Sequence, residues 1–111
     1  MKMLTMHAWG TDHQMTFEID NYTQNGNLYV GLLSHDDGYP APWQNLTINL
    51  GVKCKKNCAF IDTNNNGFEI IDWLVINNIG FLTGNVKRSG FCMYPEFEFD
   101  MQRLMEYVEG R

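Results

Sequence analysis

The stretch MTFEIDNYTQNGNLYVGLLS, residues 15–34, decides the fold. Met15, Phe17 and Ile19 alternate with polar residues, and a period of two is typical of a strand with one buried face. The Asn-Gly-Asn at residues 25–27 is a strong hairpin signal, because Asn and Gly tolerate the positive φ angles that tight turns need. The remainder of the stretch therefore predicts the return strand of an antiparallel pair.

A third strand is predicted shortly after this hairpin. Residues 35–42, HDDGYPAP, are dense in turn-forming residues. They are followed by WQNLTINL, residues 43–50, in which Leu46, Ile48 and Leu50 fall on one face. The N-terminal half is therefore predicted to be a three-stranded antiparallel meander.

The second half mixes short strands with helices. CAFID, residues 58–62, predicts a short buried strand, and the apolar run further along predicts a central helix over about residues 68–78. FLTGNVKRSG, residues 81–90, contains two glycines and no sustained periodicity. It is therefore predicted to be a loop with one short extended piece.

The end of the chain predicts one more extended segment and one more helix. FCMYPEFEFD, residues 91–100, alternates Phe97 and Phe99 with acidic residues, and Pro95 confines it to an edge or irregular strand because proline donates no ladder hydrogen bond. Asp100 is a good N-cap for a C-terminal helix. The predicted fold class is α+β: an antiparallel sheet with an N-terminal three-stranded meander, and one central and one C-terminal helix packed on it.

The central stretch FIDTNNNGFEIIDWL invites comparison with a calcium loop. Asp62, Asn64, Asn66 and Gly67 occupy the positions of the first three oxygen ligands and the turn glycine of an EF-hand. Trp73 stands where the bidentate Glu is required, and an indole offers no oxygen. The calcium interpretation therefore fails.

A helix start explains the same residues without a ligand. Asn66 is predicted to be the N-cap, and Glu69 three residues later nearly completes a capping box. Asn64 and Asn65 suit a turn, because their amides can bond to nearby backbone groups. The stretch is therefore interpreted as structural.

The composition bounds the protein class. With 111 residues, of which 44% are hydrophobic and 14% aromatic, the chain is predicted to be a single domain, residues 1–111, with one core. No apolar run approaches the length of a membrane span. The N-terminal MKMLTMHAWG lacks an apolar signal region, and the number of cysteines is odd, so a cytoplasmic location is expected.

No motif points to catalysis, a metal or a cofactor. A zinc site would require side chains that are separated in the sequence to meet in the folded protein. The candidates are Cys54, Cys58 and Cys92 with one of His7, His13 or His35. Ordinary buried thiols are the more frequent explanation, so we predict no metal site and no cofactor. Nucleophile, phosphate-loop and dinucleotide fingerprints are missing from the sequence, and a non-enzymatic protein is expected.

Charge defines two candidate binding surfaces in a chain of formal net charge −5. The first is an acidic face in the C-terminal region, made of Glu96, Glu98, Asp100, Glu106 and Glu109. The alternative is a pair of basic loops, made of Lys53, Lys55 and Lys56 and of Lys87 and Arg88. The net negative charge makes direct nucleic-acid binding the less favoured use of the chain.

Aromatic residues supply a third candidate surface. With 14% aromatics most must lie in the core, and we expect one or two to be exposed. Aromatic side chains beside the basic loops could stack on bases. The candidates are Trp9, Trp43, Tyr39, Tyr94 and Phe91.

Three segments resemble domain-of-unknown-function family 4313: NGNL after the first predicted strand, CAFIDTNNNGFEIIDWL, and TGNVKRSGFCMYPEFEFDMQRL. The resemblance covers most of the chain after about Met15 and is most specific at DTNN and at the SGFC…YP…EFD pattern. The matching residues are Asp62, Thr63, Asn64, Asn65, Ser89, Gly90, Phe91, Cys92, Tyr94, Pro95, Glu98, Phe99 and Asp100.

This resemblance implies a setting but no mechanism. The family resembled is found in Gram-positive bacteria, largely on plasmids and conjugative elements, and has no established catalytic residues. Small acidic proteins of mobile elements often inhibit host defence systems by binding. The sequence thus favours an anti-defence inhibitor, such as an anti-CRISPR or anti-restriction protein, whose acidic face would occupy a basic groove of a host defence protein. The alternative is a nucleic-acid or small-ligand binding module that uses the basic loops.

Overall fold

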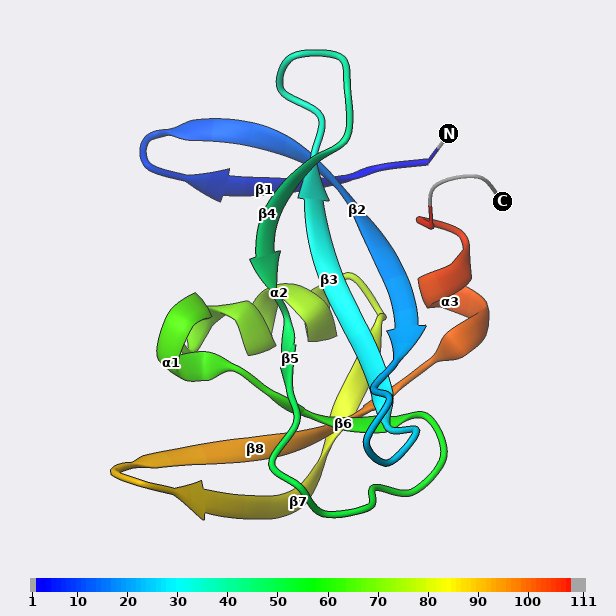
Figure 1. Ribbon diagram of the computed structural model, residues 1–111. Helices are drawn as coiled ribbons and strands as arrows, with labels where there is room; N and C mark the ends of the chain where they lie inside the picture. The colour runs from blue at the N-terminus through cyan, green and yellow to red at the C-terminus, as the bar shows by residue number, and fades with distance from the viewer. Residues whose placement is uncertain (1, 109–111) are drawn as a thin grey trace.

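A computed structural model describes residues 2–108, which form two four-stranded antiparallel sheets and three short helices (Figure 1). The first sheet has the order β1 (Leu4–Ala8), β2 (Thr11–Asn21), β3 (Leu28–Ser34), β4 (Ala41–Asn45). The second has the order β5 (Thr47–Ile48), β6 (Cys58–Ile61), β8 (Cys92–Phe99), β7 (Gly80–Ser89). The helices are α1 (Thr63–Asn66), α2 (Glu69–Ile76) and α3 (Met101–Met105). The predicted α+β class is confirmed.

The first sheet is a meander with one strand more than predicted. The β2–β3 hairpin is confirmed, and its ladder runs from the pair Met15–Ser34 to the pair Asn21–Leu28. The extra strand is β1, which pairs with β2 through a two-residue turn at Trp9 and Gly10. Sequence patterning missed β1 although Leu4, Met6 and Ala8 alternate with Thr5 and His7, because the strand is only five residues long and its Trp-Gly turn is not a usual hairpin signal.

The third predicted strand is divided between the two sheets. Leu46, which is fully buried, ends the pairing with the first sheet: its N–H donates to the Val30 carbonyl at 3.0 Å. Its own carbonyl accepts from the N–H of Asp62 at 2.9 Å, where the second sheet begins. The prediction of one strand over residues 43–50 was therefore wrong. A regular alternation of apolar residues does not reveal a strand that leaves one sheet for another.

One prediction about the second sheet was also wrong. The segment predicted as a loop with a short extended piece belongs to β7, which runs as far as Ser89 and pairs with β8. Pro95 lies in β8, an interior strand, but the strand is irregular there as the proline predicts. The β7–β8 ladder shifts register beside Pro95, and among the described residues β6 pairs with β8 only at residues 96–98.

The helix boundaries follow the capping rules, with one correction. The central helix is confirmed as α2, but Asn66 is not its N-cap. Asp62 instead caps the extra helix α1, because its carboxylate accepts from the N–H of Asn65 at 3.2 Å. α2 follows from Phe68 without a side-chain cap. Asp100 caps α3 as predicted, accepting from the N–H of Arg103 at 3.2 Å.

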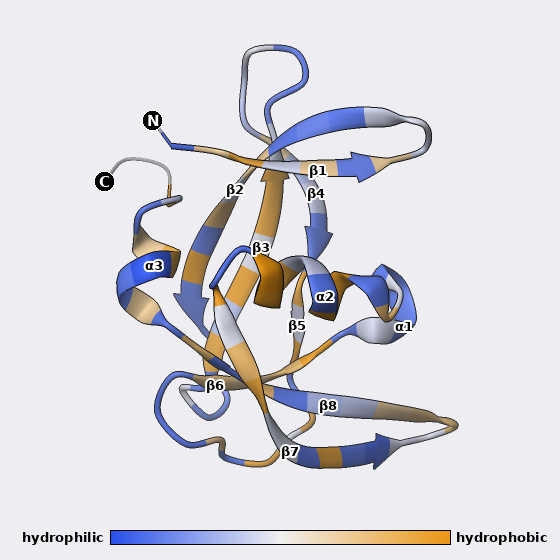
Figure 2. Cartoon of the chain, turned by 180° about the vertical axis from the view of Figure 1, so that it is seen from behind, coloured by the Kyte–Doolittle hydropathy of each residue, from blue (hydrophilic) through white to orange (hydrophobic). Residues whose placement is uncertain are grey.

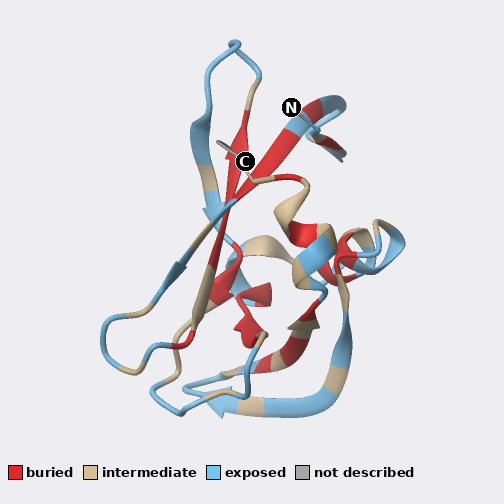
Figure 3. Ribbon diagram, turned by 90° about the vertical axis from the view of Figure 1, so that its right-hand side faces the viewer, coloured by how far each residue is buried: buried red, intermediate tan, exposed pale blue. Residues whose placement is uncertain are grey.

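The hydrophobic core lies between the sheets and under the helices (Figures 2 and 3). It combines buried residues of every layer, among them Phe17 and Leu32 of the first sheet, Phe97 of the second, Leu74 of α2 and Leu104 of α3. The segment after α3 also joins the first sheet, because the N–H of Phe17 donates to the Tyr107 carbonyl at 2.9 Å. No helix among the described residues is long and apolar enough to cross a membrane.

Candidate functional site: a groove lined by the three tryptophans

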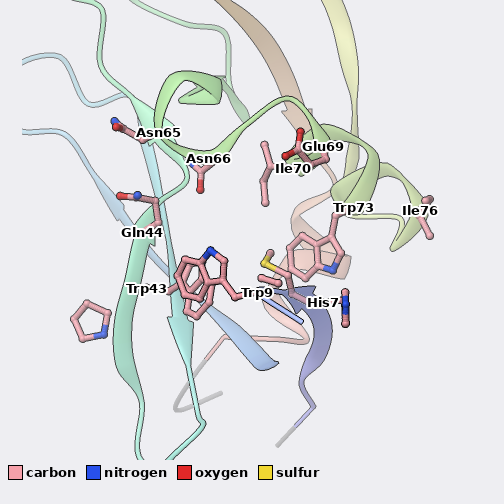
Figure 4. A pocket seen from close by; sticks show the side chains of 13 residues that line it. His7, Trp9, Trp43, Gln44, Asn65, Asn66, Glu69, Ile70, Trp73 and Ile76 are labelled. Atoms are coloured by element: carbon pink, nitrogen blue, oxygen red, sulfur yellow. The ribbon is translucent and has the colours of Figure 1, made fainter. Parts of the chain in front are cut away.

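All three tryptophans of the chain line one groove of about 810 Å³ (Figure 4). Its walls come from the β1–β2 turn, from β4, and from α1 and α2. We call it the tryptophan groove. It is lined by Met6, His7, Ala8, Trp9, Pro42, Trp43, Gln44, Asn65, Asn66, Glu69, Ile70, Trp73 and Ile76.

Trp9 is presented to the groove by a strained turn. Its φ is 52° and that of Gly10 is 77°, and the pair Ala8–Thr11 closes the turn as a two-residue loop. Two successive positive φ angles define a type I′ turn, which favours Asn-Gly because bulky side chains are strained there. A tryptophan that is 85% exposed in this position gains little burial to offset the strain. Strain of this kind clusters at functional sites.

Trp43 and His13 hold the Trp9 ring in place. The rings of Trp9 and Trp43 stack with centroids 4.9 Å apart, and the His13 ring lies 4.8 Å from that of Trp43. His13 is buried, with Nδ1 2.8 Å from an Asp36 carboxylate oxygen and Nε2 3.2 Å from the Ala8 carbonyl oxygen. The bond to Asp36 raises the pKa of His13, because both ring nitrogens face acceptors that favour the imidazolium.

The opposite wall is one face of α2. Glu69, Trp73 and Ile76 are spaced by four and three residues, which places them on the same side of the helix. The indole Nε1 of Trp73 donates to the Thr5 carbonyl at 2.8 Å and so ties the helix to β1. This bond joins two walls of the groove that come from segments distant in the sequence.

The short helix α1 is fixed to the first sheet by its amides. The Asn66 Nδ2 donates to the Asn45 carbonyl at 2.9 Å and to the Asp62 carbonyl at 2.9 Å. Gln44 and Asn65 line the same end of the groove and are exposed. Amides beside aromatic rings let a ligand make directional hydrogen bonds while it packs on an apolar floor.

The electrostatic character of the groove is acidic. Glu69 is exposed at its rim, and His7 is paired with Asp12 at 2.9 Å. Among the described residues that line the groove there is no Lys or Arg. An exposed carboxylate beside indole faces attracts cations both by charge and by the ring quadrupole.

The predicted acidic face does not form as one surface. Glu96 is only 7% exposed, and one of its oxygens accepts from the Thr83 hydroxyl at 2.7 Å and from the Asn85 amide at 3.0 Å. Glu96 therefore offers little surface to a partner, because Thr83 and Asn85 of β7 bond to it. Glu98 is half-buried on the same face of β8, within 3.9 Å of the Cys58 sulfur.

The other predicted acids are engaged locally or lie outside the described residues. Glu106 contacts Lys2 at 2.6 Å and Arg103 at 3.2 Å, and the bond to Lys2 lowers its pKa. Asp100 is exposed but serves as the cap of α3. Glu109 lies outside the described residues.

The two basic loops lie apart. Lys53, Lys55 and Lys56 are exposed in the β5–β6 connection, and the Lys53 ammonium donates to the Asn25 carbonyl at 2.9 Å. Lys87 is half-buried and Arg88 is exposed, near the far end of the β7–β8 hairpin. β8 pairs with Cys58 at Glu98 and with Arg88 at Met93, so about 17 Å of strand separates the two loops.

The thiols and imidazoles occupy different regions. The histidines bond to Asp12, Asp36 and Thr16 on the first sheet, whereas the cysteines lie on the second sheet and its connection. Burial raises the pKa of Cys58 to about 11, and burial also raises that of Cys54. No group of three or more metal-ligating side chains gathers within residues 2–108.

The aromatic residues singled out from the sequence separate into different environments. Trp9 and Trp43 come together in the groove, whereas Tyr94 is buried. Tyr39 and Phe91 are exposed elsewhere. Sequence reasoning did not include Trp73 among the candidate surface aromatics, although it lines the groove. The signal that could have found the groove is the unusual Trp-Gly pair at a tight turn.

Comparison with known proteins identifies a family for this chain but no individual relative. The model of the family described as Domain of unknown function (DUF4313) matches residues 16–111. The match includes Trp43 and Trp73 and begins after the β1–β2 turn that carries Trp9. Searches of the curated proteins and of the solved structures found no match.

Proposed function

We propose that this chain, which belongs to the DUF4313 family, is a non-enzymatic binding protein whose tryptophan groove takes an extended segment of a partner protein. The observation that carries the proposal is the strained, exposed Trp9, because an indole in a type I′ turn gains little from folding beyond one stacking contact. Exposed tryptophans in a preformed groove are the typical anchors of protein recognition.

The partner segment carries a basic side chain. The rim carboxylate of Glu69 and the faces of the indoles suit an Arg or Lys, whose stem packs on the apolar floor while its charge meets the carboxylate. An anionic ligand has no cation to pair with among the described groove residues. Charge complementarity therefore favours a basic protein segment over a nucleic-acid strand.

We place this binding protein on a mobile genetic element, as an anti-defence inhibitor of the anti-CRISPR or anti-restriction type. The family resemblance and the small acidic chain support this part of the proposal. Defence nucleases bind nucleic acid through basic surfaces, and such surfaces supply the Arg and Lys that the groove suits. We therefore place the contact with the partner protein at the tryptophan groove, and no longer at the acidic C-terminal face that the sequence favoured.

The test is target cleavage by the CRISPR effectors and restriction enzymes of candidate hosts, with and without the protein. We expect one effector to be inhibited, and Trp9→Asn to abolish that inhibition while the thermal melt stays unchanged. Tyr39→Asn, which removes an aromatic residue that is 77% exposed outside the groove, is the matched control and keeps the inhibition. Unchanged cleavage by every effector at saturating protein contradicts the anti-defence assignment. Inhibition that survives Trp9→Asn contradicts the role of the groove.

The nature of the bound segment is tested with overlapping peptides that tile the surface of the inhibited effector. Binding peptides are expected to contain Arg or Lys, and Glu69→Gln should weaken them by about tenfold, the effect of losing one charge-assisted contact. Peptides in which Arg and Lys are replaced by norleucine should bind less tightly. Peptides rich in Asp and Glu that bind as well would contradict the charge argument.

The alternative is direct nucleic-acid or small-ligand binding through Lys53, Lys55, Lys56, Lys87 and Arg88. It predicts a salt-dependent gel shift of single-stranded DNA or RNA, because phosphate contacts release counterions. The alternative also predicts that Lys55→Glu weakens binding and that Trp9→Asn does not. The same two variants therefore separate the two proposals.

A further inference from the structure

One buried histidine supports the wall of the tryptophan groove that carries Trp9 and Trp43. His13 is only 8% exposed, and its ring lies 4.8 Å from the Trp43 ring and 6.2 Å from the Trp9 ring. Figure 4 shows the two indoles stacked beside the groove, with Trp73 on the helix opposite. The His13 ring therefore lies behind this wall and contacts both of its indoles.

Both ring nitrogens of His13 meet hydrogen-bond acceptors. Nδ1 lies 2.8 Å from a carboxylate oxygen of Asp36, and Nε2 lies 3.2 Å from the carbonyl oxygen of Ala8. A neutral imidazole carries one N–H, whereas the imidazolium carries two. Both contacts are therefore hydrogen bonds only when the ring is protonated. In the neutral ring, one nitrogen lone pair faces an acceptor oxygen.

Deprotonation of His13 is expected to release the Ala8 carbonyl. The charged oxygen of Asp36 retains a proton on Nδ1 in preference to Nε2, because hydrogen bonds to ionised groups are about twice as strong as neutral ones. Ala8 immediately precedes Trp9 and pairs with Thr11 to close the two-residue turn. Loss of this donor therefore acts at the base of the turn that holds Trp9 at a φ of 52°.

The charged groups around His13 favour the imidazolium. The hydrogen bond to Asp36, in the β3–β4 connection, raises the pKa of His13, and the charge of Asp12 on β2 adds to this effect. His7 on β1 is paired with Asp12 at 2.9 Å, and β4 contributes an uncharged indole ring. His35, next to Asp36 in the sequence, is hydrogen-bonded to β2. Protonation of His13 therefore completes an ion pair with Asp36 and adds no unbalanced positive charge beside the groove.

We propose that His13 is a positioning residue of the tryptophan groove: its proton holds Trp9 against Trp43, so the groove binds a ligand more tightly when His13 is protonated. This inference rests on the proposed function, because the groove must first be a binding site. A wall that is already ordered binds at a lower cost in entropy than one that must be ordered on binding. By linkage, a bound ligand in turn favours protonation of His13. Binding by the groove is therefore coupled to the uptake of a proton.

The charge of Asp36 opposes this coupling only weakly. Deprotonation of His13 leaves the Asp36 carboxylate without a cationic partner, and a free carboxylate attracts a basic ligand. The Asp36 side chain is 42% exposed, however, so water and salt screen its charge. The carboxylate of the groove itself, Glu69, lies on the opposite wall. The order of Trp9 therefore decides the sign, and binding should weaken as the pH rises.

The first test needs no ligand and follows the indole N–H signals by NMR from about pH 5.5 to about pH 9, the range in which a histidine titrates. Trp9→Asn identifies the Trp9 signal by its disappearance. We expect this signal to shift with the same midpoint as the His13 ring, above about 6.5, while the Trp73 signal from the opposite wall stays constant. In His13→Gln the Trp9 signal should no longer respond to pH. His7→Gln, at an exposed imidazole, is the matched control and keeps the response.

Asp36→Asn separates the effect of the proton from the packing of the ring. It keeps His13 and its contacts with the indoles, but it removes the charge that favours the imidazolium. The shared midpoint is expected to move to lower pH, toward about 6.5 or below. A Trp9 signal that does not move while His13 titrates, or a midpoint that Asp36→Asn leaves unchanged, would overturn the proposal.

The second test measures binding of the peptide acetyl-Gly-Arg-Gly-amide, whose guanidinium keeps its charge over this whole range. The affinity should be about fivefold higher at about pH 6 than at about pH 8.5, a coupling at the lower end of the usual range. With His13→Gln the affinity should not depend on pH. A wild-type affinity that is constant or rises with pH overturns the inference. A peptide that binds at no pH instead contradicts the proposed preference of the groove for a basic segment, and the indole signals then decide the role of His13.

Discussion

The tryptophan groove and the β7–β8 hairpin both expose large apolar side chains, yet the chain builds them in opposite ways. The groove joins segments distant in the sequence, as in the bond from Trp73 to Thr5, 68 residues away. The exposed apolar residues of the hairpin come from one continuous segment, residues 81–93, in which β7 pairs with β8. The groove therefore depends on the whole fold, whereas the hairpin depends on its own ladder and the contacts of Glu96.

This difference teaches how the two surfaces respond to damage. A defect in the core should disturb the groove first, because its walls belong to separate elements that are positioned by core packing and by a few hydrogen bonds between them. A defect in the β7–β8 ladder should loosen the hairpin and leave the groove intact. Four substitutions test whether the groove and the hairpin respond independently, and they differ in the expected loss of free energy of unfolding.

The largest effect is expected for Leu46→Ala. Leu46 is fully buried where the chain passes between the sheets, so its loss leaves a cavity that both sheets border. We expect the free energy of unfolding to fall by about 3 kcal/mol, measured by urea denaturation. Val52→Ala, at a residue 40% exposed just beyond the same crossing, should cost less than about 1 kcal/mol. Equal losses in the two variants would show that the crossing is not a shared support.

Glu96→Ala is expected to have the next largest effect and to act on the hairpin alone. It removes a buried carboxylate that accepts from Thr83 and Asn85. Loss of hydrogen bonds to a charged group costs about 2 kcal/mol. Amide hydrogen exchange should accelerate in β7, while tryptophan fluorescence, which reports on the groove, stays constant. Glu98→Ala, on the same strand and only half-buried, is the control with a smaller effect. A change in fluorescence with Glu96→Ala would mean that the two regions are coupled.

The fold was predictable from sequence where one local pattern sufficed. The alternation at Met15, Phe17 and Ile19 and the Asn-Gly turn gave the β2–β3 hairpin, and Asp100 marked the start of α3 correctly. These signals depend only on neighbours in the chain. The family resemblance was likewise detectable from short motifs, and the match over residues 16–111 confirms the family itself.

The site was not predictable, because its geometry arises from tertiary contacts. Nothing local to Trp73 distinguishes an indole that hydrogen-bonds to β1 from one that fills the core. The parity of β8 placed Glu96 and Glu98 on one face, but the burial of Glu96 depends on its contacts with Thr83 and Asn85 of β7, which are distant in the sequence. The residues of β7 lack alternation because an interrupted ladder and an exposed edge do not require it.

Trp73→Phe is expected to have a smaller effect than either of the first two changes. Phenylalanine keeps most of the apolar contact but cannot donate to the Thr5 carbonyl at the groove wall. We expect a loss of about 1 kcal/mol in the free energy of unfolding, the usual contribution of one hydrogen bond. Trp9→Asn is the informative comparison, because relief of turn strain offsets the lost stacking and the net change should lie within about 0.5 kcal/mol. A large loss with Trp9→Asn would mean that Trp9 serves the fold and not a partner.

The smallest expected effect is a pH dependence of the free energy of unfolding. It arises from His13, which lies beside the tryptophan groove. His13 is held between Asp36 and the Ala8 carbonyl, and the hydrogen bond to Asp36 raises its pKa above the value of about 6.5 in an unfolded chain. A raised pKa in the folded state means that protonation stabilises the fold. This contribution is complete below about pH 6.5 and is lost as the pH rises through the raised pKa.

The melting temperature should therefore fall as the pH is raised above about 6.5, and the His13→Gln variant should show less of this fall. His7→Gln removes an imidazole whose partner is exposed, and it is the control that keeps the fall. Hydrogen exchange refines the test: the amides of β1 should lose protection at higher pH, because the Ala8 carbonyl loses its charged donor, while those of β7 should not. A loss of protection in both strands, or a melting temperature that rises over this range, would contradict the assigned role of His13. A change confined to β1 would show that protonation acts where the strained Trp9 turn is held, with the second sheet unaffected.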